Sequence, residues 1–468
     1  MIDGDPPSEA AARTSRPTRL GMVAGTLVLA GAVALWSPDL LSGSEPGSRG
    51  TDPAARFLLA VAVVLLVCHL FGDLMRRWGQ PPVLGEILGG LLLGPSALGM
   101  AWPAAQDWLF RPDVLGQLDR AAQLGLIVFM FVLGCELRTE RLQGPQVIGA
   151  VVAGSIALPM LAGVGLAFAA VDQLAPGGDR STSYVLFLGL ALSITALPVL
   201  ARILVDLRLD GSPIGATALS AAAIGDGLAW ILLAMVLTVA KGHGTPGDPA
   251  SWVTTGGLAL AFVLFVALVV RPALAALERP GGRRGGIDRG DYALIVLVVG
   301  AIACAAVTDL IGLHPVLGAF LFGTAVPRGS ATVRQISRRI QGFALTILLP
   351  LFFAGVGLNT SIGLLGSAPS HWLVFIAVLV AAVLTKLAGA GGAARLAGLR
   401  GPEALQIGTL MNCRGITELV VASIGLQYGL ISPLGFTVLV LMAVITTAMT
   451  GPLMRLVQPR HPAPPPTN

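Results

Sequence analysis

The sequence predicts an all-α polytopic membrane protein with about 13–14 transmembrane helices. The 468 residues are 54% hydrophobic and 12% charged, and the mean hydropathy is +0.81. Soluble domains carry about a quarter charged residues. The four cysteines lie in apolar stretches without CxxC spacing, so we expect core residues and no disulfide framework. No nucleotide fingerprint or cofactor motif is evident, and we expect neither a cofactor nor an enzymatic activity.

Apolar runs between charged or Gly/Pro-rich breaks define the predicted spans. Their centres lie near residues 28, 64, 90, 126, 158, 194, 227, 263, 300, 320, 350, 383, 416 and 445. Of the 30 Lys and Arg residues, 22 fall on one side of these spans, six on the other and two inside them. Since cytoplasmic loops carry the excess of such residues, both termini are expected in the cytoplasm. The net charge of +5 then reflects loops near anionic lipid, not nucleic-acid binding.

The first apolar run, Leu20 to Trp36, follows three arginines. No convincing small-x-small cleavage site follows it, so an uncleaved anchor helix is favoured over a secretory signal. Segment 1–56 is therefore expected to hold the cytoplasmic N-terminus, this anchor helix and an external loop. Segment 457–468 is expected to be a short cytoplasmic tail.

Asp226 lies near the middle of Ile214 to Ala240, a run without any other charge. At 1.5 Å per residue it is about 20 Å from either end of a helix, close to the bilayer midplane. Ionisable residues at that depth are rare and usually face a bundle interior or a wet cavity. Asp226 is therefore a candidate ion or proton site.

Lys386, Arg414 and Glu418 also lie within apolar runs. Membrane-depth cations need partners, and the candidates are Asp226 for Lys386 and Glu418, four residues away on one helical face, for Arg414. The alternative is that these charges snorkel or only hold the helices together.

Two predicted helices contain breaks. In Ser193–Pro198 the proline Pro198 cannot donate a backbone hydrogen bond, which frees carbonyls beside the Thr195 hydroxyl. In Met411–Glu418 the polar residue Asn412 and the glycine Gly415 interrupt an apolar run. Broken helices at the midplane are how secondary transporters build cation sites.

The breaks also indicate an internal repeat. Each is the fifth of six spans, counted from the span near 64 and from the span near 300, and a single span near 263 separates the halves. Two halves of opposite orientation, with crossed discontinuous helices, form an inverted-topology repeat.

Six motifs resemble, in order, those of the monovalent cation:proton antiporter-2 family, in the branch of the plant cation/proton exchangers. They are Pro82–Gly99, Ser193–Arg202, Gly225–Trp230, His314–Gly323, Lys386 and Asn412–Leu419. The resemblance covers roughly residues 57 to 456. It implies a homodimer whose protomers divide into a scaffold domain and a core domain that moves like an elevator.

On that resemblance, residues 57–456 form the exchanger domain. The scaffold helices span about 57–136 and 291–360, the core helices about 146–240 and 371–456, and a linker helix about 253–274. Asp226 matches the cation- and proton-binding carboxylate, Thr195 the hydroxyl beside it, and Lys386 the basic residue of the third-last helix. Arg414 and Glu418 match the charged pair of the second broken helix.

Gly225 departs from the family pattern, which usually has Asn, Asp or Gln directly before the key aspartate. With one carboxylate evident in the motif, electroneutral exchange is the weakly favoured expectation, unless Lys386 also releases a proton.

The predicted function is a secondary active antiporter, in the cell membrane and most simply a bacterial inner membrane. It would exchange K⁺ or Na⁺ for protons by alternating access, with Asp226 shared between cation and proton. The alternatives are a gated potassium-efflux channel, export of an organic cation, and a regulatory membrane scaffold. For Glu86 and His69 a packing or interfacial role is favoured over pH sensing.

Overall fold

The structure is a computed structural model. It describes residues 53–136, 144–209, 211–241, 249–277, 289–311, 313–327, 331–366 and 368–457. The predicted anchor helix near residue 28, the rest of segment 1–52 and the tail 458–468 lie outside these residues. All regular secondary structure in the described ranges is helical.

Ten helical stretches in the described ranges are long and apolar enough to cross a membrane. Their main helices are α3 (Pro53–Arg77), α4 (Pro82–Leu93), α7 (Pro112–Glu136), α8 (Pro145–Ala169), α12 (Pro213–Lys241), α13 (Pro249–Phe265), α15 (Arg289–Leu310), α18 (Leu349–Leu358), α19 (Pro369–Lys386) and α23 (Pro433–Val457). Three further spans are formed by shorter helices: the broken pair α10 (Thr182–Ser193) and α11 (Leu197–Asp206), α16 (Pro315–Ala325), and the broken pair α21 (Gly401–Met411) and α22 (Ile416–Gln427).

Shorter elements connect these spans. They are α5 (Leu98–Ala101), α6 (Pro103–Leu109), α9 (Val171–Leu174), α14 (Arg271–Leu277), α17 (Ala331–Phe343) and α20 (Gly392–Leu396), with π-helical turns η3 (Val266–Val270), η4 (Ala344–Leu348) and η6 (Leu387–Gly391). Every predicted span centre from 64 to 445 falls on a helix or at a break between two half-helices. The order of an inverted repeat is confirmed, since the broken helix is fifth of six in both halves and α13 lies between them.

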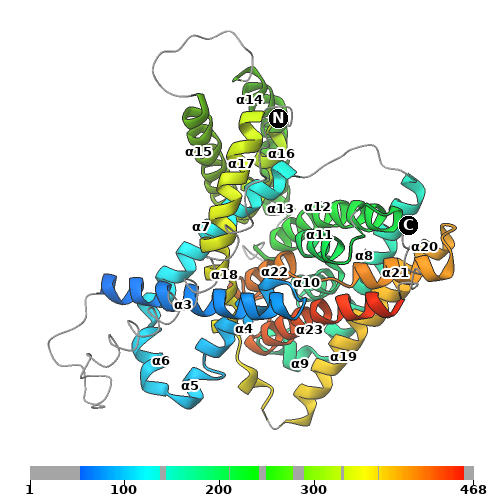
Figure 1. Ribbon diagram of the computed structural model, residues 1–468. Helices are drawn as coiled ribbons and strands as arrows, with labels where there is room; N and C mark the ends of the chain where they lie inside the picture. Colours follow the sequence, from blue (N-terminus) through cyan, green and yellow to red (C-terminus); the bar gives the residue numbers. More distant parts are fainter. Residues whose placement is uncertain are drawn as a thin grey trace, which may run out of the picture.

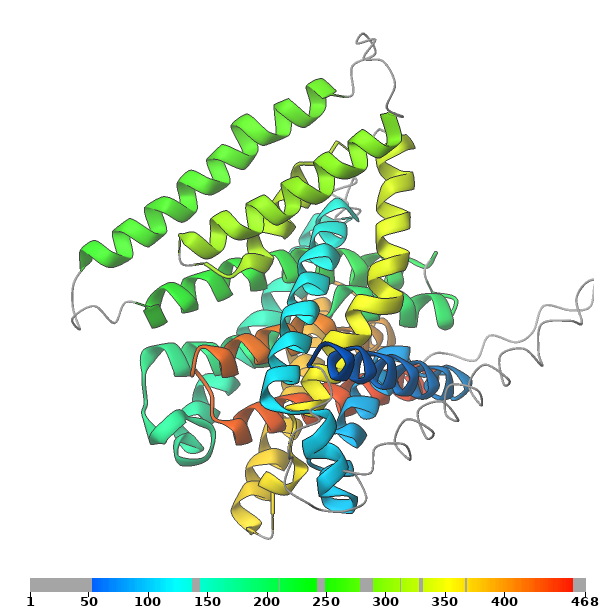
Figure 2. The ribbon, with the colours of Figure 1, turned by 90° about the vertical axis from the view of Figure 1, so that its left-hand side faces the viewer.

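Two sets of helices pack mainly among themselves. One set contains α3, α4, α7, α15, α16 and α18, and the other contains α8, α10, α11, α12, α19, α21, α22 and α23. Figure 1 shows the second set in the right-hand half, with α10 and α22 near the centre. The helix formed by α13 and α14 lies at one edge of the molecule, outside both sets (Figure 2).

The outer surface of the bundle is apolar. Leu260, Leu268, Leu310 and Leu373 are each more than half exposed, and only 17% of the apolar window at Gly257–Ala275 is buried inside the protein. Water would penalise so much exposed apolar surface, whereas lipid does not. The chain is therefore a multi-pass membrane protein.

Two glycines bring α8 and the π-helical turn η6 into backbone contact. A Cβ at Gly154 would lie 2.1 Å from the carbonyl oxygen of Gly389, and a Cβ at Gly389 would lie 2.3 Å from the carbonyl oxygen of Gly154. Small residues permit this close approach of membrane helices. Since η6 directly follows Lys386 and Gly154 directly precedes Ser155, the contact sets the depth of Lys386 relative to α8.

Gly154→Ala should therefore destabilise the protein by about 1–3 kcal/mol, the typical cost of overpacking. The matched control is Gly149→Ala on the same helix, where a Cβ meets nothing within 4 Å and the gain in helix propensity is the same. Thermal melting in detergent should show a lower Tm for Gly154→Ala than for Gly149→Ala. Equal Tm values would show that the backbone contact is not tight.

Candidate ion-binding site

The two breaks lie against each other in the middle of the second set of helices. The backbone N–H of Ala196 donates to the carbonyl of Cys413 at 3.1 Å, and the Thr195 hydroxyl donates to the carbonyl of Met411 at 3.0 Å. The expected crossing of two discontinuous helices is thus confirmed. We call this region, Ile194–Ala196 with Asn412–Gly415, the crossing.

Pro198 and Gly415 have different places in the crossing. Pro198 lies in the first turn of α11, where the missing N–H costs no helical hydrogen bond, so the break itself precedes it. Gly415 is the residue before α22, and a Cβ there would lie 2.6 Å from Cγ2 of Val199. Gly415 thereby lets the second break approach α11 closely.

Two basic side chains, Arg414 and Lys386, bind the carboxyl end of the half-helix α10. The Arg414 guanidinium donates to the carbonyls of Ala191 at 3.0 Å and Leu192 at 2.6 Å. Lys386 Nζ donates to the next carbonyl, that of Ser193, at 2.6 Å. These carbonyls have lost their helical partners and carry the negative end of the helix dipole. The buried basic side chains supply hydrogen bonds to these carbonyls and lie at the negative end of the helix dipole.

Lys386 uses all three of its donors on oxygen atoms. Besides Ser193, its Nζ binds the carbonyl of Ser155 at 2.9 Å and the Thr195 hydroxyl at 2.7 Å. Asp226, the partner chosen from the sequence, is not among the hydrogen-bond partners of Lys386, because the Ser193 carbonyl at the end of α10, the Ser155 carbonyl within α8 and the Thr195 hydroxyl take its three donors. Of the carbonyls beside Thr195, that of Ser193 is bound by Lys386, and the Thr195 hydroxyl links Lys386 to the carbonyl of Met411.

Arg414 and Glu418 form the ion pair that the sequence indicated. Nη1 of Arg414 lies 3.1 Å from Oε2 of Glu418, and both side chains are 0% exposed. The Thr447 hydroxyl accepts a hydrogen bond from the Arg414 N–H at 3.2 Å and also donates to the Arg414 carbonyl. α23 thus holds the backbone of the second break in place.

Asp226 of α12 lies at the amino end of the other half-helix, α11. It is 1% exposed, and its Oδ2 accepts a long hydrogen bond, 3.4 Å, from the N–H of Leu197. Its Oδ1 has no partner. The positive end of a helix dipole favours an anion at this place. The Asp226 carboxylate therefore lies at the crossing, and no basic side chain forms an ion pair with it in the described residues.

Further polar atoms without partners surround the crossing. The Thr417 hydroxyl faces the Asp226 carboxylate without meeting the geometry of a hydrogen bond, and neither polar atom of the Asn412 amide has a partner. Buried polar groups are normally satisfied, so these atoms are candidate ligands of an ion. Sequence reasoning assigned no role to Thr417 or Ser155, although Thr417 lies within the polar interruption that it noted.

Comparison with known proteins identifies the family of this chain. A family model described as "Sodium/hydrogen exchanger, transmembrane" matches residues 60–456. The chain belongs to the transmembrane sodium/hydrogen exchanger family. The resemblance to the antiporter-2 family and its plant exchanger branch is confirmed by this match and by relatives that include several cation/H(+) antiporters of Arabidopsis thaliana. Cation/H(+) antiporter 20 of Arabidopsis thaliana is 37% identical over 405 residues, which cover 84% of this chain and 47% of that protein.

The Na(+)/H(+) antiporter NhaS4 of Synechocystis sp. is 35% identical over 411 residues, covering 87% of this chain and 98% of the relative. The chain thus matches nearly all of this bacterial relative but spans about half the length of the Arabidopsis proteins. The solved structure of the sodium proton antiporter MjNhaP1 from Methanocaldococcus jannaschii has a TM-score of 0.59 at 16% identity, covering 86% of this chain and 96% of that one. That likeness shows the fold of this chain.

Arg414→Gln should destabilise the exchanger by about 3–5 kcal/mol, because it leaves Glu418 and the end of α10 buried without their cation. The control is Arg76→Gln, which removes the ion pair between Arg76 and Asp73. Both of these side chains are about half exposed, so the substitution should lower the free energy of unfolding by at most about 1 kcal/mol. Melting of the two variants in detergent compares the losses. Equal losses would contradict a structural dependence on Arg414.

Proposed function

We propose that this exchanger is a secondary active antiporter that moves K⁺ or Na⁺ in exchange for protons, with Asp226 as the shared site. The names of its relatives support cation/proton exchange. The observation that carries the proposal is the Asp226 carboxylate, which is buried at the crossing with one oxygen atom unpartnered.

The chemistry follows from the cost of a bare carboxylate in an apolar interior. An isolated buried charge is expensive, and either a proton or a monovalent cation neutralises it. The Thr417 hydroxyl and the Asn412 amide oxygen would supply ligands that complete the shell of a dehydrated cation. Because one carboxylate cannot hold both ligands at once, arrival of either ligand displaces the other.

Coupled exchange further requires that the empty, charged site does not cross the membrane. The proposed moving part is the core, about 146–240 and 371–456, which contains the crossing. The scaffold, about 57–136 and 291–360, would stay fixed in a homodimer, with the helix at about 253–274 as linker. Alternating exposure of a fixed site by movement of one part against another is the usual mechanism of such repeats.

The driving force is adequate for this mechanism. One pH unit supplies about 1.4 kcal/mol per proton, and an uncompensated charge crossing 100 mV gains or loses about 2.3 kcal/mol. The proposed location is a bacterial inner membrane with both termini in the cytoplasm, so an inward proton gradient would drive cation export.

Asp226→Asn should abolish cation-dependent proton flux in proteoliposomes, because an amide neither releases a proton nor balances a cation. The matched control is Asp113→Asn, which removes an exposed carboxylate 3.4 Å from Arg111 and should leave the flux intact. Size-exclusion profiles and Tm values establish that both variants fold. Retained exchange by folded Asp226→Asn protein would refute the proposal.

Exchange should be insensitive to membrane voltage, because one proton for one cation moves no net charge. Gly225 supplies no second carboxylate, and all three contacts of Lys386 Nζ are to oxygen atoms other than those of Asp226. The test compares flux with and without a potassium diffusion potential, using Na⁺ as the exchanged ion. Flux that follows the potential would contradict this stoichiometry, and loss of that dependence in Lys386→Gln would assign the second proton to Lys386.

A further inference from the structure

A cavity lies between the two sets of helices at one end of the bundle. Its volume is about 410 Å³, and its walls come from α7 and α18 on one side and from α22 on the other. This end is opposite to the arginine-rich loops, so the charge distribution places it outside the cell. A water molecule takes about 30 Å³ in the liquid, so the cavity has room for a monovalent cation with waters around it.

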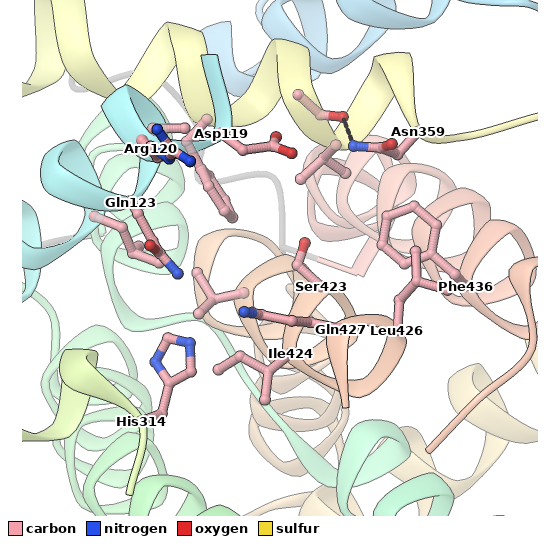
Figure 3. A pocket seen from close by; sticks show the side chains of 16 residues that line it. Asp119, Arg120, Gln123, His314, Asn359, Ser423, Ile424, Leu426, Gln427 and Phe436 are labelled. Atoms are coloured by element: carbon pink, nitrogen blue, oxygen red, sulfur yellow. Dashed lines mark hydrogen bonds between the residues drawn. The ribbon is translucent and has the colours of Figure 1, made fainter. Parts of the chain in front are cut away.

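Oxygen-bearing side chains converge on this space. Figure 3 shows the Asp119 carboxylate and the Ser423 hydroxyl directed towards the same space, with the amides of Gln123 and Gln427 extending into it from opposite sides. Carboxylate, hydroxyl and amide oxygens are the ligands that hard cations prefer. Asp119 is exposed and forms no ion pair or hydrogen bond within the described residues; Arg120, the next residue along α7, also lines the cavity but is not paired with Asp119.

The cavity also lies close to the crossing. Val420 of α22 lines it, and Val420 is three residues along the same helix from Thr417, a rise of about 4.5 Å. This wall of the cavity is therefore about one helical turn from Thr417, the residue that faces Asp226.

We propose that this cavity is a second binding site for a monovalent cation, with Asp119 as its carboxylate. The role of this site rests on the proposed function: it would concentrate the cation at the external face of the membrane and present it to Asp226. Asp119 and Gln123 come from one set of helices, and Ser423 and Gln427 come from the other. A cation held between them bridges the two sets and stabilises the arrangement in which the cavity is open.

Cation binding can be tested apart from transport in protein that carries Asp226→Asn. The Tm is measured during titration with KCl and with NaCl, against N-methyl-D-glucamine chloride at equal ionic strength, since a ligand of the folded state raises the Tm. Stabilisation by K⁺ or Na⁺ should persist in Asp226→Asn and in Asp113→Asn/Asp226→Asn. It should disappear in Asp119→Asn/Asp226→Asn. Absence of stabilisation in Asp226→Asn, or its persistence without Asp119, overturns the proposal.

Transport tests the role of the site. Asp119→Asn alone should raise the external cation concentration that gives half of the maximal rate about tenfold, which corresponds to about 1.4 kcal/mol, while Asp113→Asn should leave it unchanged. An equal half-saturating concentration in Asp119→Asn and the unaltered exchanger overturns the role as a presenting site. Retained exchange in Asp226→Asn would contradict the proposed function and not the second site. In either case, the Tm titration shows whether a cation binds at Asp119.

Discussion

The architecture of this exchanger depends on the neutralisation of one helix end inside the membrane. Breaking α10 from α11 leaves three carbonyls in an interior that has no bulk water to bond them. Arg414 reaches two of these carbonyls from the second broken helix, and Lys386 reaches the third from α19. The same contacts fasten three helices together, so the broken conformation and the packing around it stabilise each other.

That arrangement gives the charges of the crossing different tasks. Arg414 is paired with Glu418, and Lys386 is saturated by two carbonyls and a hydroxyl. Asp226 has only a long hydrogen bond from the amino end of α11 and keeps one free oxygen. Glu418 also keeps one oxygen without a partner, Oε1, but its other oxygen is paired with Arg414, whereas Asp226 forms no ion pair within the described residues. This difference separates a structural charge from an exchangeable one, and it is why the proposed coupling rests on Asp226 alone.

Much of this fold could be predicted from sequence because the membrane imposes simple constraints. Apolar runs located the spans, Pro198 and Gly415 marked the neighbourhoods of the breaks, and the spacing of four residues paired Arg414 with Glu418. The partner of Lys386 could not be predicted in this way, since its ligands are mainly backbone carbonyls, which every residue carries. The position of the Ser155 carbonyl relative to Lys386 depends on the contact between Gly154 and Gly389, a tertiary approach that leaves no periodic pattern. The cavity at Asp119 was missed for a similar reason, because its walls come from helices distant in sequence.

The central claim is that Asp226 exchanges a proton for a cation. Its most direct test is proton release from purified protein in a weakly buffered detergent solution when K⁺ or Na⁺ is added at constant ionic strength. The unaltered protein should release protons as the cation binds, and folded Asp226→Asn protein should release none. Equal release by both proteins, or cation binding without release by the unaltered exchanger, would contradict this claim.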